Sequence, residues 1–121
     1  MSAHFVLLHV DHPLASAGFY AKLLQREPVE SSPTFVMFGL AEGLMLGLWS
    51  RHTAEPAPTG GPGASELAFV AASDADVDAT HRRWQADGVR IVQAPERKEF
   101  GYTCTGVDPD GHRLRVFAPG A

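Results

Sequence analysis

Near its C-terminus the sequence reads Asp108-Pro109-Asp110-Gly111-His112-Arg113-Leu114-Arg115-Val116. Its first four residues are typical of a tight turn, because Pro fixes φ, Asp bonds nearby backbone amides and Gly accepts a left-handed backbone. Strand-like runs stand on either side of this turn, at 102–107 and 112–117. The stretch therefore predicts a β-hairpin.

The segment before the hairpin predicts a strand, a helix and a further strand, at 66–71, 74–87 and 90–93. Ser73 or Asp74 is placed to cap the N-terminus of the helix with its side-chain oxygen. A glycine directly after the helix favours its termination there. The second half of the chain therefore has the order βαβββ.

The first half repeats this order. It predicts a strand at 5–10, a helix at 13–26, a weak strand at 28–30, and strands at 34–40 and 43–50. One proline favours the start of the helix and a second proline ends it. The buried side of this helix is predicted from apolar residues at helical spacing, namely Leu14, Ala17, Ala21 and Leu24.

Two βαβββ units in one chain indicate an internal repeat of the α+β class. The segment 53–65 contains three prolines and three glycines, which predicts a linker or mobile loop. We expect a single domain over 1–121, with unit one at about 4–52 and unit two at about 66–118, because either half alone is too small for comfortable stability. The alternative is a plain α+β domain with accidental symmetry.

Composition excludes several classes of partner. Lys and Arg number 10 against 14 Asp and Glu, so the formal charge is −4, which argues against a nucleic-acid partner. No apolar run approaches the ~18 residues of a membrane-spanning helix. The single cysteine, Cys104, excludes an intrachain disulfide. We expect a cytoplasmic protein with no nucleic-acid partner and no membrane partner.

Several motifs resemble the vicinal oxygen chelate superfamily, which includes glyoxalase I, extradiol dioxygenases and bleomycin-resistance proteins. The matching motifs are Val10 with Ser16…Phe19-Tyr20…Leu23-Leu24, Glu66-Leu67-Ala68-Phe69, Gly88-Val89 and the Asp-Pro-Asp-Gly hairpin. The resemblance implies two βαβββ units whose strands form a curled mixed sheet, a cup with the helices outside and a ligand inside. It also implies a homodimer.

The metal enzymes of that superfamily have His or Glu at four strand positions, which fall here on Phe5, Gly47, Glu66 and Arg115. Phenyl and glycine bring no donor atom, and a protonated guanidinium repels a divalent cation. We therefore expect no metal and no cofactor. Instead we expect Glu66 to contact Arg115, the alternative being two separately solvated charges.

The predicted ligand-binding residues of unit one come from three strands. The resemblance puts Phe5 and the position of Gly47 on the ligand-facing side, and alternation of side chains then adds His9, Met45 and Trp49 to that side. The run 35–38 is apolar on both faces, so Phe35 and Met37, or alternatively Phe38, complete this set. For Trp49 the alternative is packing in an ordinary core.

The segment Glu99-Phe100-Gly101-Tyr102-Thr103 resembles a Glu-aromatic-Gly-x-Thr motif of bleomycin-resistance proteins. The resemblance places Phe100 over the planar rings of a ligand, with Tyr102 as a possible neighbour. Those proteins also have Arg where the metal enzymes have their last Glu, as Arg115 does here. The alternative for Phe100 is a loop aromatic that covers the core.

These features predict a metal-free protein that sequesters a small planar aromatic ligand, as in antibiotic resistance. Two enzymatic alternatives stay open. One is a metal enzyme of the glyoxalase, lyase or dioxygenase type with a displaced site, using Glu66 with His9 or His4. The other is a metal-free enzyme with Glu66 or His9 as general base, and geometry has to decide between them.

Overall fold

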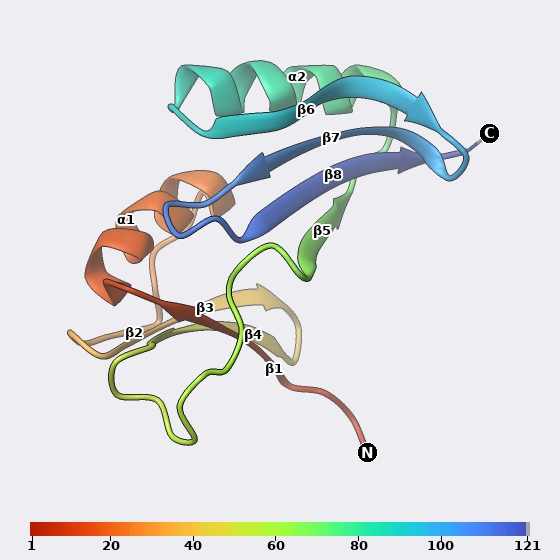
Figure 1. Cartoon of the computed structure of the whole chain (residues 1–121). Helices are drawn as coiled ribbons and strands as arrows, with labels where there is room; N and C mark the ends of the chain where they lie inside the picture. The colour runs from red at the N-terminus through yellow and green to blue at the C-terminus, as the bar shows by residue number, and fades with distance from the viewer. Residues whose placement is uncertain (121) are drawn as a thin grey trace. The chain divides into compact units, whose positions relative to one another are not determined.

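The computed structural model describes residues 1–120, and the chain divides into two compact units, Met1–Gly61 and a second that begins at Pro62. This division falls inside the predicted linker of residues 53–65. Figure 1 follows the chain through both units. Each unit has a sheet, a helix and a core of its own. Their union in a single domain stays a prediction.

Unit 1 has one helix and a four-stranded mixed sheet. Its elements in chain order are β1 (Phe5–Val10), α1 (Pro13–Leu24), β2 (Glu30–Ser31), β3 (Phe35–Ala41) and β4 (Leu44–Ser50). The strand order is β1-β4-β3-β2, with β1 parallel to β4 and the other pairs antiparallel. The weak strand predicted at 28–30 is the two-residue β2.

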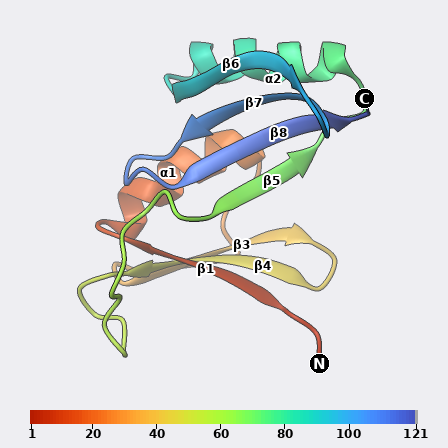
Figure 2. The same cartoon turned by 45° about the vertical axis from the view of Figure 1, so that its right-hand side comes forward.

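Unit 2 repeats this topology. Its elements are β5 (Glu66–Val70), α2 (Asp74–Ala86), β6 (Arg90–Lys98), β7 (Gly101–Val107) and β8 (Arg113–Pro119). The strand order is β5-β8-β7-β6, with β5 parallel to β8, so each unit has its first strand at one edge (Figure 2). The predicted α+β class with two βαβββ repeats is confirmed.

Helix α1 is rotated relative to the predicted apolar stripe. Leu14 is 52% exposed, whereas the buried side consists of Pro13, Ser16, Ala17, Tyr20 and Leu23. The pattern was misleading because alanines count as apolar yet bury little area, so Tyr20 and Leu23 decide which side packs. The helix also ends two residues before the predicted limit, since Gln25 adopts a left-handed backbone with φ 55°.

Helix α2 follows the sequence more closely. The hydroxyl of Ser73 accepts a hydrogen bond from the backbone N–H of Asp76, as an N-cap does. Val77 and Trp84 are buried against the sheet. Cys104 is fully buried too, and burial raises the pKa of its thiol to about 11. A thiol in that state is protonated at neutral pH and is part of the core.

The predicted hairpin turn is anchored by one carboxylate. Oδ1 of Asp108 accepts hydrogen bonds from the backbone N–H groups of Asp110 (2.9 Å), Gly111 (2.9 Å) and His112 (2.8 Å). Gly111 has φ 103°, a backbone conformation that favours glycine. Asp108 is itself buried, so its carboxylate joins the turn to the end of β7.

Replacing this anchor should destabilise the fold. Asp108→Ala removes the side-chain acceptor of three backbone N–H groups, of which that of Gly111 keeps the backbone oxygen of Asp108. We expect the free energy of unfolding to fall by about 2 kcal/mol in urea denaturation. The matched control is Glu99→Ala, which removes one carboxylate from an exposed position between β6 and β7. Equal losses in the two variants would contradict the anchoring role.

Candidate functional site

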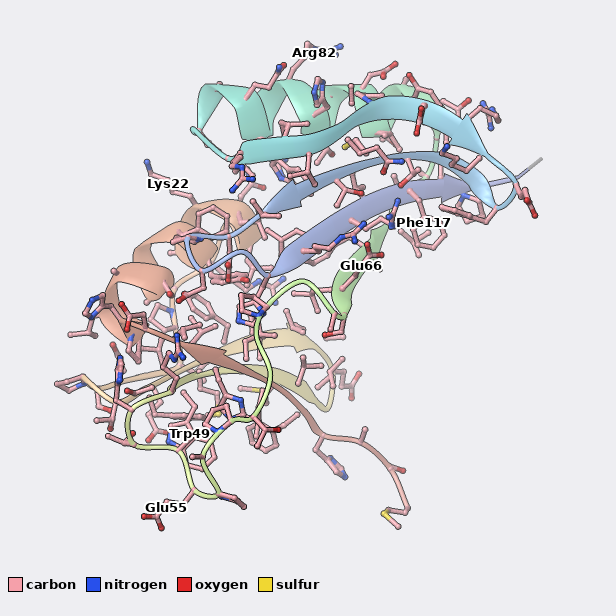
Figure 3. The ribbon with its side chains drawn as sticks, in the orientation of Figure 1. Lys22, Trp49, Glu55, Glu66, Arg82 and Phe117 are labelled. Atoms are coloured by element: carbon pink, nitrogen blue, oxygen red, sulfur yellow. The ribbon has the colours of Figure 1, made fainter. Side chains whose placement is uncertain are left out.

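Three strands of unit 1 present a largely apolar sheet face on the side opposite α1. The residues that share this apolar face are Phe5, Leu7 and His9 of β1, Phe35 and Met37 of β3, and Met45, Gly47 and Trp49 of β4. Figure 3 shows Trp49 on that side of the sheet. Six of the residues predicted for ligand binding therefore lie together.

The apolar face holds a cavity of about 430 Å³ that is widely open to solvent and is lined by Phe5, Leu7, Phe35 and Trp49. This volume is within the range of small-molecule sites, which are mostly apolar. The imidazole of His9 extends the aromatic wall, with its ring centre 5.9 Å from that of Trp49 and the two planes tilted by 41°. Flat aromatic surfaces of this kind suit a planar ligand.

Gly47 makes room for two of the cavity walls. A Cβ atom at this position would lie 2.7 Å from Cδ2 of Leu7 and 2.9 Å from Cζ of Phe35. Both side chains therefore lie over the glycine, where a Cβ atom would displace them. At this position a metal enzyme of the superfamily would have a ligand, whereas here the chain has an apolar floor.

Filling this floor should reshape the cavity. In Gly47→Ala the new methyl group displaces Leu7 and Phe35 and takes up space on the floor of the cavity. We therefore expect the affinity for the uncharged dye Nile red to fall about fivefold in a fluorescence titration. Gly39→Ala is the matched control, because a Cβ there meets no atom within 4 Å. An unchanged affinity in Gly47→Ala would contradict the assignment of the cavity.

Unit 2 presents a polar sheet face on the side opposite α2. The residues that share this polar face include Glu66 of β5, Gln93 of β6, Thr103 and Thr105 of β7, and Arg113, Arg115 and Phe117 of β8. Figure 3 shows Glu66 and Phe117 on that side of the sheet. The two predicted ionic residues, Glu66 and Arg115, are thus on one surface.

The predicted contact between Glu66 and Arg115 is confirmed and is bidentate. Nε of Arg115 donates to Oε1 of Glu66 at 2.8 Å, and Nη2 donates to Oε2 at 3.0 Å. Nη1 donates to Oε1 of Gln93 and to Oγ1 of Thr103, both at 3.0 Å. The guanidinium therefore links residues of all four strands of the sheet.

The acceptors around Arg115 are themselves held in place. Oγ1 of Thr103 donates to the backbone oxygen of Val116 at 2.9 Å. Oγ1 of Thr105 donates to Oε1 of Gln93 at 2.8 Å. The hydrogen bonds from Arg115 lower the pKa of Glu66 below its ordinary value of 4.5, against the opposing effect of burial. Glu66 is therefore a fixed carboxylate with both oxygens engaged.

These residues do not fit the metal ion of the superfamily's enzymes. Glu66 has both carboxylate oxygens committed to a cation, and Phe5 and Gly47 offer no donor atom. Within residues 1–120, no group of three or more His, Cys, Asp or Glu side chains is arranged to hold a metal. These side chains therefore do not support a reaction that uses a metal ion bound at the positions of the superfamily's metal ligands.

Phe100 adjoins the polar face. Its ring packs edge-to-face on Phe117, with the centres 5.7 Å apart, and the guanidinium carbon of Arg115 lies 5.7 Å from its centre. The side chain is nevertheless 47% exposed. A partly exposed ring beside a cation is a suitable stacking surface for a planar ligand.

Two of the predicted residues lie on the helix-facing sides instead. Phe38 is fully buried among the core residues of unit 1, so the face of 34–40 that adjoins the cavity is the one with Phe35 and Met37. The hydroxyl of Tyr102 donates to Oδ1 of Asp78 in α2 at 2.8 Å, and this bond raises its pKa. Tyr102 points away from Arg115 because adjacent strand residues face opposite sides.

The structure also adds residues that the sequence analysis omitted. They are Leu7 in the cavity and Gln93, Thr103, Arg113 and Phe117 on the polar face. Alternation alone identifies three of them, because they share a parity with residues already chosen on β1 and β8. Gln93 required the register of β6 against β7, which contains irregularities, and Thr103 required the register of β7 against β8.

The chain matches the Glyoxalase/Bleomycin resistance protein/Dioxygenase superfamily over residues 2–116. The protein belongs to this superfamily. Its two βαβββ units are those that the resemblance implies. Within residues 1–120, neither helix of this superfamily member is long and apolar enough to cross a membrane.

Individual relatives extend the comparison. The chain is 28% identical over 113 residues to the phenazine antibiotic resistance protein EhpR of Enterobacter agglomerans, which covers 91% of this chain and 86% of that protein. It is 53% identical to protein ATC0852 of Agrobacterium tumefaciens, with a TM-score of 0.90 and coverage of 100% and 99%. A glyoxalase-related enzyme of Fulvimarina pelagi shares the fold at 23% identity, with a TM-score of 0.84 and coverage of 98% and 88%.

The contact of Glu66 with Arg115 should make stability depend on pH. Because the folded-state pKa of Glu66 is lowered, its contribution is fully present above about 4.5 and is lost as the pH falls through the lower folded-state value. We expect Glu66→Gln to lose less stability than the wild type between neutral pH and about pH 3 in urea denaturation. Glu99→Gln, which neutralises an exposed carboxylate, should lose as much as the wild type, and parallel behaviour of Glu66→Gln would contradict the assignment.

Proposed function

We propose that this protein binds and sequesters a planar aromatic small molecule of the phenazine class, without a metal ion and without converting the ligand. The observation that carries the proposal is the apolar cavity of about 430 Å³ with Phe5, Phe35 and Trp49 in its wall. The similarity to a phenazine antibiotic resistance protein supports the ligand class. Resistance then follows from a lower concentration of free compound.

Stacking and burial supply the affinity in this proposal. Burying apolar surface contributes about 25 cal/mol per Å², and each aromatic contact adds about 1 kcal/mol beyond that. A rigid tricyclic ligand loses little conformational freedom on binding, so most of this gain is retained. The wall residues come from strands β1, β3 and β4, whose backbone bonds hold the aromatic surfaces in place.

The enzymatic alternative with Glu66 as general base is less well supported. A general base needs a pKa near the working pH. Both oxygens of Glu66 accept hydrogen bonds from Arg115, and its pKa is lowered rather than raised. The geometry therefore favours a structural carboxylate over a proton acceptor.

The proposal is tested by titrating the protein with unsubstituted phenazine in a calorimeter. Trp49→Ala and Phe35→Ala each remove one aromatic wall, and we expect each to raise Kd about tenfold, which corresponds to about 1.4 kcal/mol. Leu14→Ala is the matched control, because it truncates an exposed apolar residue on α1. Its Kd should equal that of the wild type.

Three results would overturn this function. The first is an absence of binding up to the solubility limit of phenazine. The second is a changed mass of the phenazine recovered after incubation, which would indicate chemistry. The third is a stoichiometric metal in the purified protein whose removal abolishes binding.

The proposal includes a homodimer in the cytoplasm. Within each unit the first strand, β1 or β5, lies at the edge of its sheet, and edge strands present backbone groups for pairing with another chain. Light scattering should then give a mass of twice 13.0 kDa. A mass of one chain at micromolar concentration would contradict the dimer.

A further inference from the structure

The polar face of unit 2 carries more positive than negative charge. Nη2 of Arg113 lies 3.0 Å from Oε2 of Glu66, the same carboxylate that Arg115 engages in a bidentate contact. Two guanidinium groups thus share one carboxylate, which leaves an excess of one positive charge. Nearby, Lys98 and Glu96 pair with each other at 3.0 Å and cancel. The chain as a whole carries −4, so this excess is local.

The two guanidinium groups differ in how completely they are used. Arg115 donates to three different side chains and is 15% exposed. Arg113 is 41% exposed, and the contact that the structure gives its side chain within residues 1–120 is the one to Glu66. Its Nε is buried without a hydrogen-bond partner. Since a guanidinium has five N–H donors, Arg113 retains donors for a further acceptor.

An aromatic surface lies on the other side of Arg115. Phe117 shares its strand face with Arg113 and Arg115, and Phe100 packs edge-to-face on Phe117. Residues two apart on a strand are about 7 Å apart. The polar face therefore presents three groups in a row. They are the partly exposed ring of Phe100, the engaged guanidinium of Arg115 and the guanidinium of Arg113, which has spare donors. A flat ligand that covers Phe100 and Arg115 has its far edge near Arg113.

We propose that the polar face of unit 2 binds a planar aromatic carboxylate, with Arg113 donating to the carboxylate and Phe100 stacking on the ring. A carboxylate matches the fork of guanidinium donors, and a charge-assisted bond of this kind is stronger than a neutral one. Arg115, the cation nearest to Phe100, is already engaged by Glu66, Gln93 and Thr103. The ligand therefore needs an aromatic ring that extends from Phe100 towards Arg113. The inference depends on unit 2 alone and does not require the cavity of unit 1 to bind a ligand.

The probes are a phenazine carboxylate and the carboxamide with the same ring system, titrated calorimetrically at low salt. We expect the carboxylate to bind at least tenfold more tightly, and the preference to shrink as salt screens the charges. Arg113→Gln should abolish the preference, and Arg113→Lys should restore part of it. Arg82→Gln is the matched control, because it removes one arginine charge from α2, away from the polar face (Figure 3).

Several outcomes would overturn the inference. They are equal affinity for the two probes, a preference that survives in Arg113→Gln, and an equal loss in Arg82→Gln, which would indicate a general effect of net charge. Inorganic phosphate is a further probe, and competition by phosphate at the same concentration as the aromatic carboxylate would overturn the role of the ring. Melting midpoints of Arg113→Gln and Arg113→Lys verify that both variants are folded.

Two more variants separate this inference from the proposed function. Trp49→Ala weakens the binding of unsubstituted phenazine in the proposed function, yet it should leave the preference for the carboxylate intact. Phe100→Leu removes the ring from the polar face and should weaken both probes about fivefold, while unsubstituted phenazine still binds the cavity of unit 1. A lost preference in Trp49→Ala would contradict a site built on unit 2 alone.

Discussion

The guanidinium of Arg115 is the group on which the chemistry of unit 2 depends. It engages both oxygens of Glu66 and, through Gln93 and Thr103, reaches the two strands beyond β8. A carboxylate held in this way is a poor base and a poor metal ligand, because the adjacent guanidinium lowers its pKa and repels a metal cation. One side chain therefore opposes two chemical roles of Glu66, as a base and as a metal ligand.

The two units use one topology for two different surfaces. In unit 1 the sheet face opposite the helix is apolar, and the missing side chain of Gly47 lets two wall residues lie over the strand. In unit 2 the equivalent face is ionic and hydrogen-bonded. In a repeat of this kind the backbone topology stays the same, while the residues on the sheet face opposite the helix can differ. This is possible because side-chain alternation separates the core side of each strand from the other side.

Most of the correct sequence predictions rest on local signals, such as turn and cap residues. The hairpin, the cap at Ser73 and the order of helices and strands along the chain were predictable because turn and cap residues act on their own neighbours. The rotation of α1 was not predictable, because alanines made its buried side hard to identify from the spacing of apolar residues. Tyr102 and Gln93 show a further limit, because the face of a strand residue is known only after the strand is paired, and the irregular register between β6 and β7 is a property of the folded sheet.

The turn held by Asp108 constrains how this sequence can evolve. The turn sets which residues of β8 face the helix, and the alternation of Leu114 and Val116 with Arg113 and Arg115 follows from it. Insertion of a single residue after Gly111 would move every later side chain of β8 to the opposite side, placing guanidinium groups under α2 and two core residues in their place. Point substitutions on β8 can therefore accumulate one at a time, whereas a change in the length of this loop would exchange the polar face and the core in one step.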